Sequence, residues 1–306
     1  MVPVPRKLAI LTGPTGVGKT EVSVEVALQL GTEILSADSM AVYRRMESAT
    51  AKPSADARRR VPHHLLDLAD PTERFTVADF RNAAIPIVER LLGEGRMPLL
   101  VGGTRLYLNA LTAPFDSGPE PDAAFRLSLE DRSAPELHAV LAERDPETAV
   151  RLAPADRKRI VRALEVLHST GRPISVWQAD SRVQGGMYEA VWVALVRDRA
   201  ELYARVNARV DAMMAAGLLE EVQGFLAEGL GPDTPAMQGH GYKEIMRALL
   251  GQYSLTEGVR LLKRNTRHYV KYQLMWLRGM PEVHLISADQ PTEQVIAEVV
   301  GAFRFR

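Results

Sequence analysis

The residues with the most obvious chemistry form one run near the N-terminus, Gly13-Pro-Thr-Gly-Val-Gly-Lys-Thr20. This run matches the pattern G-x-x-x-x-G-K-[ST] in full, between the apolar segment Leu8–Leu11 and a helical pattern. In such a loop the backbone N–H groups cradle phosphate oxygens, the lysine reaches the terminal phosphates and the last hydroxyl ligates Mg²⁺. We therefore predict a phosphate-binding loop (P-loop) with Thr20 as the Mg²⁺ ligand. Its residues are Gly13, Pro14, Thr15, Gly16, Val17, Gly18, Lys19 and Thr20.

The phosphate that this loop holds is less clear from the residues alone. A nucleoside triphosphatase usually has an acid at the end of a second apolar strand, where it holds the metal shell. Here the best candidate strand, Pro98–Val101, is followed by Gly102-Gly103-Thr104. The pattern argues against motor-type ATP hydrolysis and favours a loop that holds a diphosphate. ATP binding and a small-molecule kinase activity stay open.

A second candidate is Asp38, in the run Ser36-Ala-Asp-Ser-Met40 after the apolar segment Glu33–Ser36. In open parallel sheets, ligands bind outside the carboxyl ends of the strands. Asp38 is therefore expected to face the same crevice as the P-loop, where a carboxylate can act as a general base. Asp and Ser are also common helix N-caps, so the position alone leaves both roles open.

The elements that position these residues follow from the apolar pattern. Short apolar runs alternate with helical patterns, which predicts an α/β fold with a parallel sheet flanked by helices. Residues 123–170 are helical throughout and lie between strand-bearing parts, which predicts an all-helical insertion. We expect a P-loop core over 1–117, the insertion over 118–189 and the rest of the core over 190–306. The predicted strands are Leu8–Leu11, Glu33–Ser36, Pro98–Val101, Ala190–Val196 and Val283–Ile286, and the main helices span about 76–92, 199–229 and 255–278.

Composition excludes several classes of protein. The 306 residues include no cysteine, which rules out disulfides, thiolate zinc sites and iron–sulfur clusters. No apolar stretch approaches the length of a membrane span, and the first residues do not resemble a signal peptide. We expect a cytoplasmic protein with no membrane association.

The charges balance overall, 38 basic against 38 acidic, but they are distributed unevenly. Six basic residues and no acid lie between Val259 and Met280, and a second basic cluster lies in 151–175. Lys263, Arg267 and Lys271 recur at a spacing of four, which places them on one face of a helix. Such stripes are typical of a surface that binds RNA backbone, although a solvated helical face gives the same pattern.

Eight blocks of the sequence, in order, resemble bacterial tRNA dimethylallyltransferases. One P-loop alone would be weak evidence, whereas eight blocks in register are specific. Besides the P-loop they are Ser36–Tyr43, Thr50–Pro53, Val61–Asp67, Val101–Tyr107, Arg159–Glu165, Gly241–Glu244 and Gln273–Arg278.

The resemblance implies a reaction and roles for individual residues. A dimethylallyl group would pass from dimethylallyl diphosphate to N6 of the adenosine 3′ of the anticodon, with Mg²⁺ as the cofactor. Asp38 matches the family's general base and Arg209 a residue near the diphosphate. Thr104 matches a threonine near the reacting centre, although its position after Gly102-Gly103 also suits a helix cap. The family pattern assigns tRNA contacts to Asp38, Ser39, Met40, Ala41, Arg126, Lys158, Arg159, Ile160, Val161 and Arg162.

The chain departs from the family pattern at two places. Lys271-Tyr272-Gln273 stands where the family usually has Lys-Arg-Gln, so a phosphate contact is lost or Tyr272 stacks on a base instead. Gln238-Gly239-His240 stands where the family often has Gln-Ala-Ile, and His240 is either a polar contact or, as we expect, a loop histidine without a role.

The main alternative is an adenylate isopentenyltransferase, which prenylates free nucleotides. The helical insertion and the basic stripes favour the anticodon stem-loop of tRNA as the partner, because a nucleotide needs neither. We expect the protein to act as a monomer.

Overall fold

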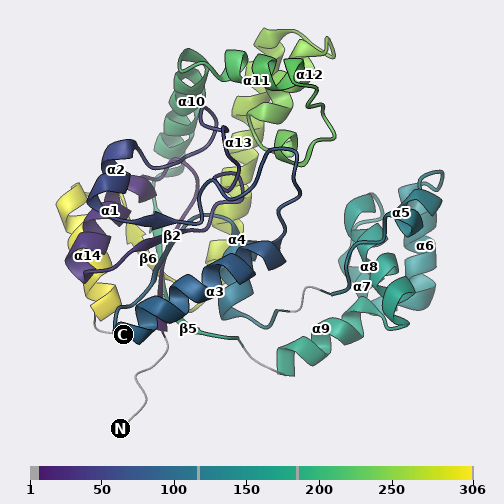
Figure 1. Ribbon diagram of the computed structural model, residues 1–306, viewed down its shortest axis with the longest axis horizontal. Helices are drawn as coiled ribbons and strands as arrows, with labels where there is room; N and C mark the ends of the chain where they lie inside the picture. Colours follow the sequence, from purple (N-terminus) through teal and green to yellow (C-terminus); the bar gives the residue numbers. More distant parts are fainter. Residues whose placement is uncertain (1–6, 116–117, 184–185, 305–306) are drawn as a thin grey trace. The chain divides into compact units, whose positions relative to one another are not determined.

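Six parallel strands form the sheet that carries the P-loop (Figure 1). Their order across the sheet is β3-β2-β4-β1-β5-β6, and all neighbouring strands are parallel. Five of the strands lie where apolar runs predicted them, which confirms the predicted α/β fold. The sixth, β3, has only two residues, too few to leave a pattern in the sequence. The strands are β1 (Lys7–Thr12), β2 (Ile34–Ser36), β3 (His63–His64), β4 (Leu99–Val101), β5 (Glu189–Val196) and β6 (His284–Ser287).

This computed structural model describes residues 7–115, 118–183 and 186–304. The chain divides into two compact units. The first comprises Met1–Leu108 and Tyr188–Arg306, and the second is Asn109–Met187. The sequence predicts the insertion over 118–189, and residue 117, just before it, lies outside the described residues.

Both faces of the sheet are buried, which is why its strands are continuous apolar runs rather than alternating ones. Successive residues of β1 point to opposite faces, and Leu8–Leu11 are all fully buried. Helices α1 (Lys19–Leu30) and α14 (Thr292–Arg304) pack side by side on one face. Helix α3 (Val77–Gly93) buries one stripe, Phe80, Ala84, Val88 and Leu91, at helical spacing.

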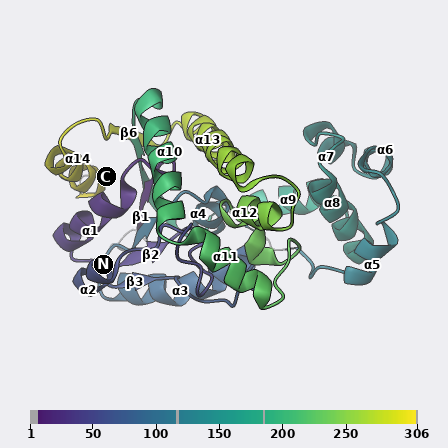
Figure 2. The same cartoon turned by 90° about the horizontal axis from the view of Figure 1, so that it is seen from above.

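The remaining helices include α4, which runs from the first unit into the second, and others that belong to the first unit alone (Figure 2). The helix expected over 199–229 is in fact two, because Gly217 adopts a left-handed conformation (φ 98°) between α10 and α11. Helix α13 has the predicted bounds. The elements are α2 (Ala55–Arg60), α4 (Arg105–Thr112), α10 (Arg199–Ala215), α11 (Leu218–Ala227), the 3₁₀ turn η1 (Pro235–Gln238), α12 (Tyr242–Leu249) and α13 (Leu255–Arg278).

The second unit is all-helical and has an apolar core of its own, built around Leu137, Leu141, Ile160 and Ala163. The chain segments at the two ends of this unit are in close contact. A Cβ atom on Gly186 would collide with the carbonyl group of Thr112. Its helices are α5 (Ala123–Ser128), α6 (Ala134–Arg144), α7 (Pro146–Arg151), α8 (Arg157–Thr170) and α9 (Ile174–Val183).

No helix among the described residues is long and apolar enough to cross a bilayer.

Candidate active site

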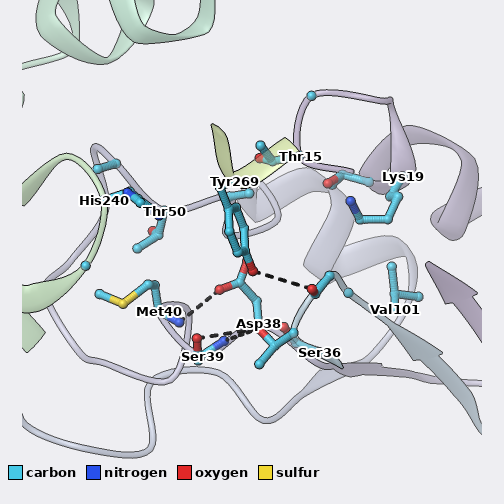
Figure 3. A pocket seen from close by; sticks show the side chains of 18 of the residues that line it. Thr15, Lys19, Ser36, Asp38, Ser39, Met40, Thr50, Val101, His240 and Tyr269 are labelled. Carbon is cyan, nitrogen blue, oxygen red and sulfur yellow. Dashed lines mark hydrogen bonds between the residues drawn. The ribbon is translucent and has the colours of Figure 1, made fainter. Parts of the chain in front are cut away.

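Three loops meet at the carboxyl edge of the sheet and line one cavity of about 840 Å³. They follow β1, β2 and β4, which are neighbours in the order β2-β4-β1. The loop after β1 is the P-loop, the loop after β2 carries Asp38, and the loop after β4 carries Gly102, Gly103 and Thr104. The cavity has the volume of a small-molecule site, and both candidates from the sequence line it (Figure 3).

Three glycines set the backbone conformation of the P-loop. Gly13, Gly16 and Gly18 all have positive φ, a region that side-chain-bearing residues rarely adopt. At Gly13 a Cβ atom would also strike the carbonyl oxygen of Leu195. The Nζ of Lys19 donates to the carbonyl oxygens of Gly13 (2.9 Å) and Pro14 (3.0 Å), so the lysine folds back along the loop.

Two basic side chains and one acid set the electrostatics of the cavity. Burial lowers the pKa of Lys19 to about 8, although the charge of Asp38 opposes the shift. Burial also lowers the pKa of Arg209, again against the attraction of Asp38. The positive charges are held partly out of water, where their attraction for an anion is stronger than on an exposed surface.

Asp38 lies in a tight turn and not at a helix end. Its Oδ1 accepts a hydrogen bond from the N–H of Met40 at 2.9 Å, and no helix begins in the turn that follows (Figure 3). The N-cap alternative therefore has no helix to cap. The second carboxylate oxygen takes no hydrogen bond among those described, and the side chain lines the cavity.

Thr104 connects the β4 loop to the Asp38 turn. Its Oγ1 accepts a hydrogen bond from the N–H of Ser39 at 3.1 Å, and its own N–H donates to the carbonyl of Ala37 at 3.2 Å. Gly102 makes this approach possible, because any Cβ there would overlap the backbone of Ala37. Gly102 is thus explained by close contact between two loops.

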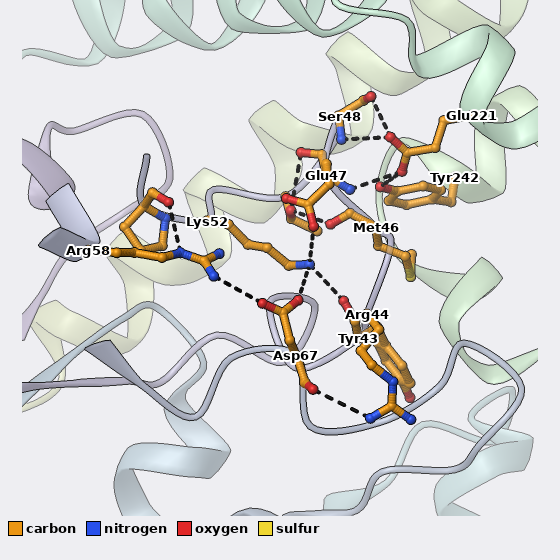
Figure 4. A network of polar contacts seen from close by, with 12 residues as sticks. Tyr43, Arg44, Met46, Glu47, Ser48, Lys52, Arg58, Asp67, Glu221 and Tyr242 are labelled. Carbon is orange, nitrogen blue, oxygen red and sulfur yellow. Dashed lines mark hydrogen bonds and ion pairs between the residues drawn. The ribbon is translucent and has the colours of Figure 1, made fainter. Parts of the chain in front are cut away.

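The segment between Tyr43 and Pro53 forms one wall of the cavity and has no regular secondary structure. Two sets of polar contacts hold this segment in place (Figure 4). Lys52, whose side chain is 3% exposed, donates to the carbonyl of Tyr43 and pairs with Asp67 at 2.6 Å. On the other side, the carboxylate of Glu221 from α11 accepts hydrogen bonds from the backbone N–H groups of Glu47 and Ser48. The wall is therefore fixed from both sides.

Three further residues at the cavity were not predicted as site residues. Gln273, 2% exposed, accepts a hydrogen bond from the N–H of Thr15 and donates to the carbonyl of Gly103. Arg205 donates through Nε to the carbonyl of Gly16 at 2.9 Å. Tyr269 lies beside Asp38 (Figure 3), and burial together with that charge raises its pKa to about 12. In the sequence, only the spacing of one helical turn from Arg209 points to Arg205 as a site residue. No sequence pattern points to Tyr269.

The residues predicted to contact tRNA in the first unit do not all reach solvent. Ser39 and Met40 line the cavity, but Ala41 is 2% exposed, so its side chain is out of reach of a ligand. On α13, Lys271 is exposed. Lys263 pairs with Asp211 at 2.6 Å and Arg267 donates to Asn207 at 2.6 Å, so both are engaged within the protein.

In the second unit the predicted contacts are also of two kinds. Lys158 and Arg159 are exposed, whereas Ile160 is fully buried in the core of the unit and offers no side chain to a tRNA. Arg126 and Arg162 both pair with Glu165 at 2.6 Å. Burial alone would raise the pKa of Glu165, but these two guanidinium groups outweigh it and lower the pKa to about 2.

A parallel sheet with a complete P-loop after one strand and a cavity-lining carboxylate after another defines a P-loop protein of the α/β class. The chain matches the IPP transferase family over residues 41–280 and the isopentenyl transferase family over residues 6–63. It is 45% identical to the tRNA dimethylallyltransferase of Syntrophobacter fumaroxidans, over 96% of this chain and 86% of the relative. It is also 45% identical to that of Desulforudis audaxviator, over 98% of both chains.

Solved structures agree with these matches. The tRNA isopentenylpyrophosphate transferase of Bacillus halodurans superposes with a TM-score of 0.74 at 37% identity, over 97% of this chain and 95% of that one. A eukaryotic dimethylallyltransferase acting on tRNA superposes with a TM-score of 0.81 at 25% identity, over 97% and 79%. The chain belongs to the tRNA dimethylallyltransferase family, and it is a transferase.

Proposed function

We propose that this chain transfers a dimethylallyl group from dimethylallyl diphosphate to N6 of the adenosine 3′ of the anticodon in tRNA. The observation that carries the proposal is the meeting of the P-loop, Asp38 and Thr104 in one cavity, on a family member matched along nearly its whole length. Relatives named for action on tRNA supply the acceptor. We propose that the enzyme acts as a monomer, and in the cytoplasm, where tRNA is found.

The proposed donor side is the P-loop with Arg209. As the C1–O bond of the allylic diphosphate breaks, negative charge grows on the leaving diphosphate. Lys19, Arg209 and the loop N–H groups stabilise that charge, which is the form of electrostatic catalysis that usually contributes most. Because the diphosphate is the leaving group, the loop acts without phosphoryl transfer.

The protein oxygen available here fits a magnesium ion whose other ligands come mainly from the substrate. Thr20, at the first turn of α1, brings its hydroxyl-bearing side chain to the cavity. Mg²⁺ keeps several waters and takes only one or two protein oxygens when it binds phosphates, so a single threonine is enough. When bound, the ion supplies further neutralisation of the diphosphate.

The proposed acceptor side is the Asp38 turn. The N6 amine forms a bond to C1 of the dimethylallyl group and gives up a proton, which the Asp38 carboxylate accepts. Two hydrogen bonds hold the turn that carries this carboxylate, one from the Met40 N–H to Asp38 and one from the Ser39 N–H to Oγ1 of Thr104. A stacked adenine cannot enter the cavity, so the base must be flipped out of the anticodon loop.

Mass spectrometry of nucleosides after incubation with dimethylallyl diphosphate and Mg²⁺ tests the proposal. An anticodon stem-loop should yield N6-dimethylallyladenosine, and AMP should yield none. Prenylated AMP in place of prenylated RNA would identify a nucleotide prenyltransferase. Phosphate transfer from ATP without any prenyl transfer would identify a kinase.

A further inference from the structure

One buried amide connects the P-loop, which we assign to the donor, with the Gly103–Thr104 loop, which contacts the Asp38 turn on the acceptor side. The Oε1 of Gln273 accepts a hydrogen bond from the N–H of Thr15 in the P-loop at 2.9 Å. The Nε2 of the same side chain donates to the carbonyl of Gly103 at 3.2 Å. Both polar atoms of the amide are used, and reversing the group would place donor against donor and acceptor against acceptor.

Gln273 joins the two loops beyond the point where the hydrogen bonds between β1 and β4 end. Pairing of β1 with β4 ends at Leu11 and Val101, and the last backbone bond between the two loops runs from the N–H of Gly102 to the carbonyl of Leu11. The hydroxyl of Thr12 adds a bond to the carbonyl of Gly102. Thr15 and Gly103 lie beyond these contacts, and Gln273 joins them across the floor of the cavity.

The amide is carried by a rigid support. Gln273 belongs to the buried face of α13, together with Val270, Trp276 and Leu277. Gly103 is shaped to receive it, because a Cβ atom at that position would overlap Nε2 of Gln273. The glycine and the glutamine therefore form a matched pair.

We propose that Gln273 is a positioning residue that sets the spacing between the P-loop and the Gly103–Thr104 loop, and thus between donor carbon and acceptor nitrogen. The inference rests on the proposed function, since that function places the diphosphate in the P-loop and the general base on the Asp38 turn, which Thr104 joins to the other loop. Gln273 acts through these loops. A displacement of about 1 Å between reacting groups costs up to about 10²-fold in rate, so a connection of this kind matters for the chemical step.

The geometry makes an unusual prediction for binding. In this structure the Thr15 N–H is occupied by a protein acceptor and is not available to a phosphate oxygen. Gln273→Met keeps the length of the side chain but removes both hydrogen bonds. The freed N–H becomes an additional phosphate donor, so affinity for inorganic diphosphate should be unchanged or higher while transfer slows.

The test uses the full chain and begins with wild-type transfer to an anticodon stem-loop. No transfer by the wild type would overturn the proposed function, and the diphosphate affinity of Gln273→Met would still report on Thr15. With wild-type transfer established, Gln273→Met should slow single-turnover transfer by about 10- to 100-fold at saturating substrates. Calorimetry should show diphosphate affinity equal to the wild type or higher.

A second variant gives a pH signature that a structural role would not produce. Gln273→Glu offers an acceptor to Thr15, but only its protonated form can also donate to the carbonyl of Gly103. The rate of this variant relative to wild type should therefore rise as pH falls from about 8 to about 5.5, toward the range in which a buried carboxyl group protonates.

The matched control is Asn265→Leu on the same helix. Asn265 donates to Glu244 at 2.8 Å and does not line the cavity, so the variant removes a partly buried amide without touching either loop. It should keep wild-type transfer. The inference is overturned if Gln273→Met transfers within about twofold of wild type, or if Asn265→Leu shows the same loss of rate.

Discussion

Asp38 and Lys19 approach one cavity from different loops, and each has a local contact that fixes where it points. Asp38 is held by the Met40 N–H through one oxygen, which leaves the other for a substrate proton. The side chain of Lys19 donates hydrogen bonds to carbonyl groups of its own loop and is partly buried. These contacts allow the two roles to be tested separately.

Asp38→Asn should preserve the structure of the turn but abolish its ability to accept a proton. Asparagine presents the same Oδ1 to Met40 but has no basicity, so both substrates should bind as in wild type. Single-turnover transfer should slow on the order of 10²–10⁴-fold, the range for a lost general base. A rate within a few-fold of wild type at saturating substrates would exclude the assignment.

Lys19 should give diphosphate binding a distinct pH dependence. Burial lowers its pKa to about 8, so in the free enzyme the positive charge is present below that pH and is lost above it. Calorimetry with inorganic diphosphate should show affinity falling as pH rises through about 8. Lys19→Ala should lack this fall and transfer about 10²-fold more slowly, as expected when one charge-assisted contact to the developing anion is removed. An unchanged pH profile in Lys19→Ala would show that another group titrates.

Helix α13 combines two roles at the scale of an element. Its buried face carries Gln273, which bonds to the P-loop and to Gly103, and another face carries Lys263, Arg267 and Lys271. The structure separates these cations, since Lys263 and Arg267 already have partners in α10 and Lys271 is exposed. Basic residues of equal spacing are therefore unequal in their availability to RNA.

Neutralising Lys271 should weaken tRNA binding more than neutralising Lys263. Each phosphate contact that is lost should lower the slope of log affinity against log salt by about one unit or less. Lys271→Gln, Lys263→Gln and the exposed control Arg59→Gln on α2 remove one charge each. Binding titrations of an anticodon stem-loop over a range of salt measure the three slopes. Equal slopes for all three would show that α13 is a solvated face.

The strands and most helices could be predicted because their signals are local. The run Leu8–Leu11 followed by Gly13–Thr20 specifies strand, loop and helix within a few residues. The contacts that complete the site are not local: Thr15 and Gln273 are 258 positions apart, and Glu47 and Glu221 are 174 apart. No spacing rule links such pairs. Burial of Ile160 and Ala41 likewise depends on packing that their neighbours in sequence do not reveal.

At the scale of the whole molecule, charged side chains hold the amino end of β2. Glu33, just before β2, accepts hydrogen bonds from Arg90 (2.6 Å) and Arg96 (2.9 Å) and lies 2.7 Å from the Nε2 of His64. These contacts join α3, β3 and the loop before β4 to one carboxylate. The hydrogen bond from Arg90 is the largest cause that lowers the pKa of Glu33, to about 2.

Glu33→Gln should lower the Tm at neutral pH, and this difference from wild type should disappear in acid. The folded-state pKa lies below the ordinary value of 4.5, so the carboxylate stabilises the fold above about pH 4.5. That contribution is lost as pH falls from there toward about 2. The difference in Tm between wild type and Glu33→Gln should narrow over this range, with Glu298→Gln on the exposed side of α14 as the control. A difference in Tm that is constant with pH would show that the carboxylate charge is not responsible.

The contact between Thr112 and Gly186 has a consequence for engineering. The chain between them forms a helical body with its own apolar core, and its two ends emerge side by side. Closing the gap with a few flexible residues costs little entropy, and bodies inserted in this way can be exchanged without rebuilding their host. A shortened enzyme lacking this body should fold and hold inorganic diphosphate. The same junction is the natural splice point for grafting the helical body of a relative, so that this body can be varied while the P-loop and the Asp38 turn stay as they are.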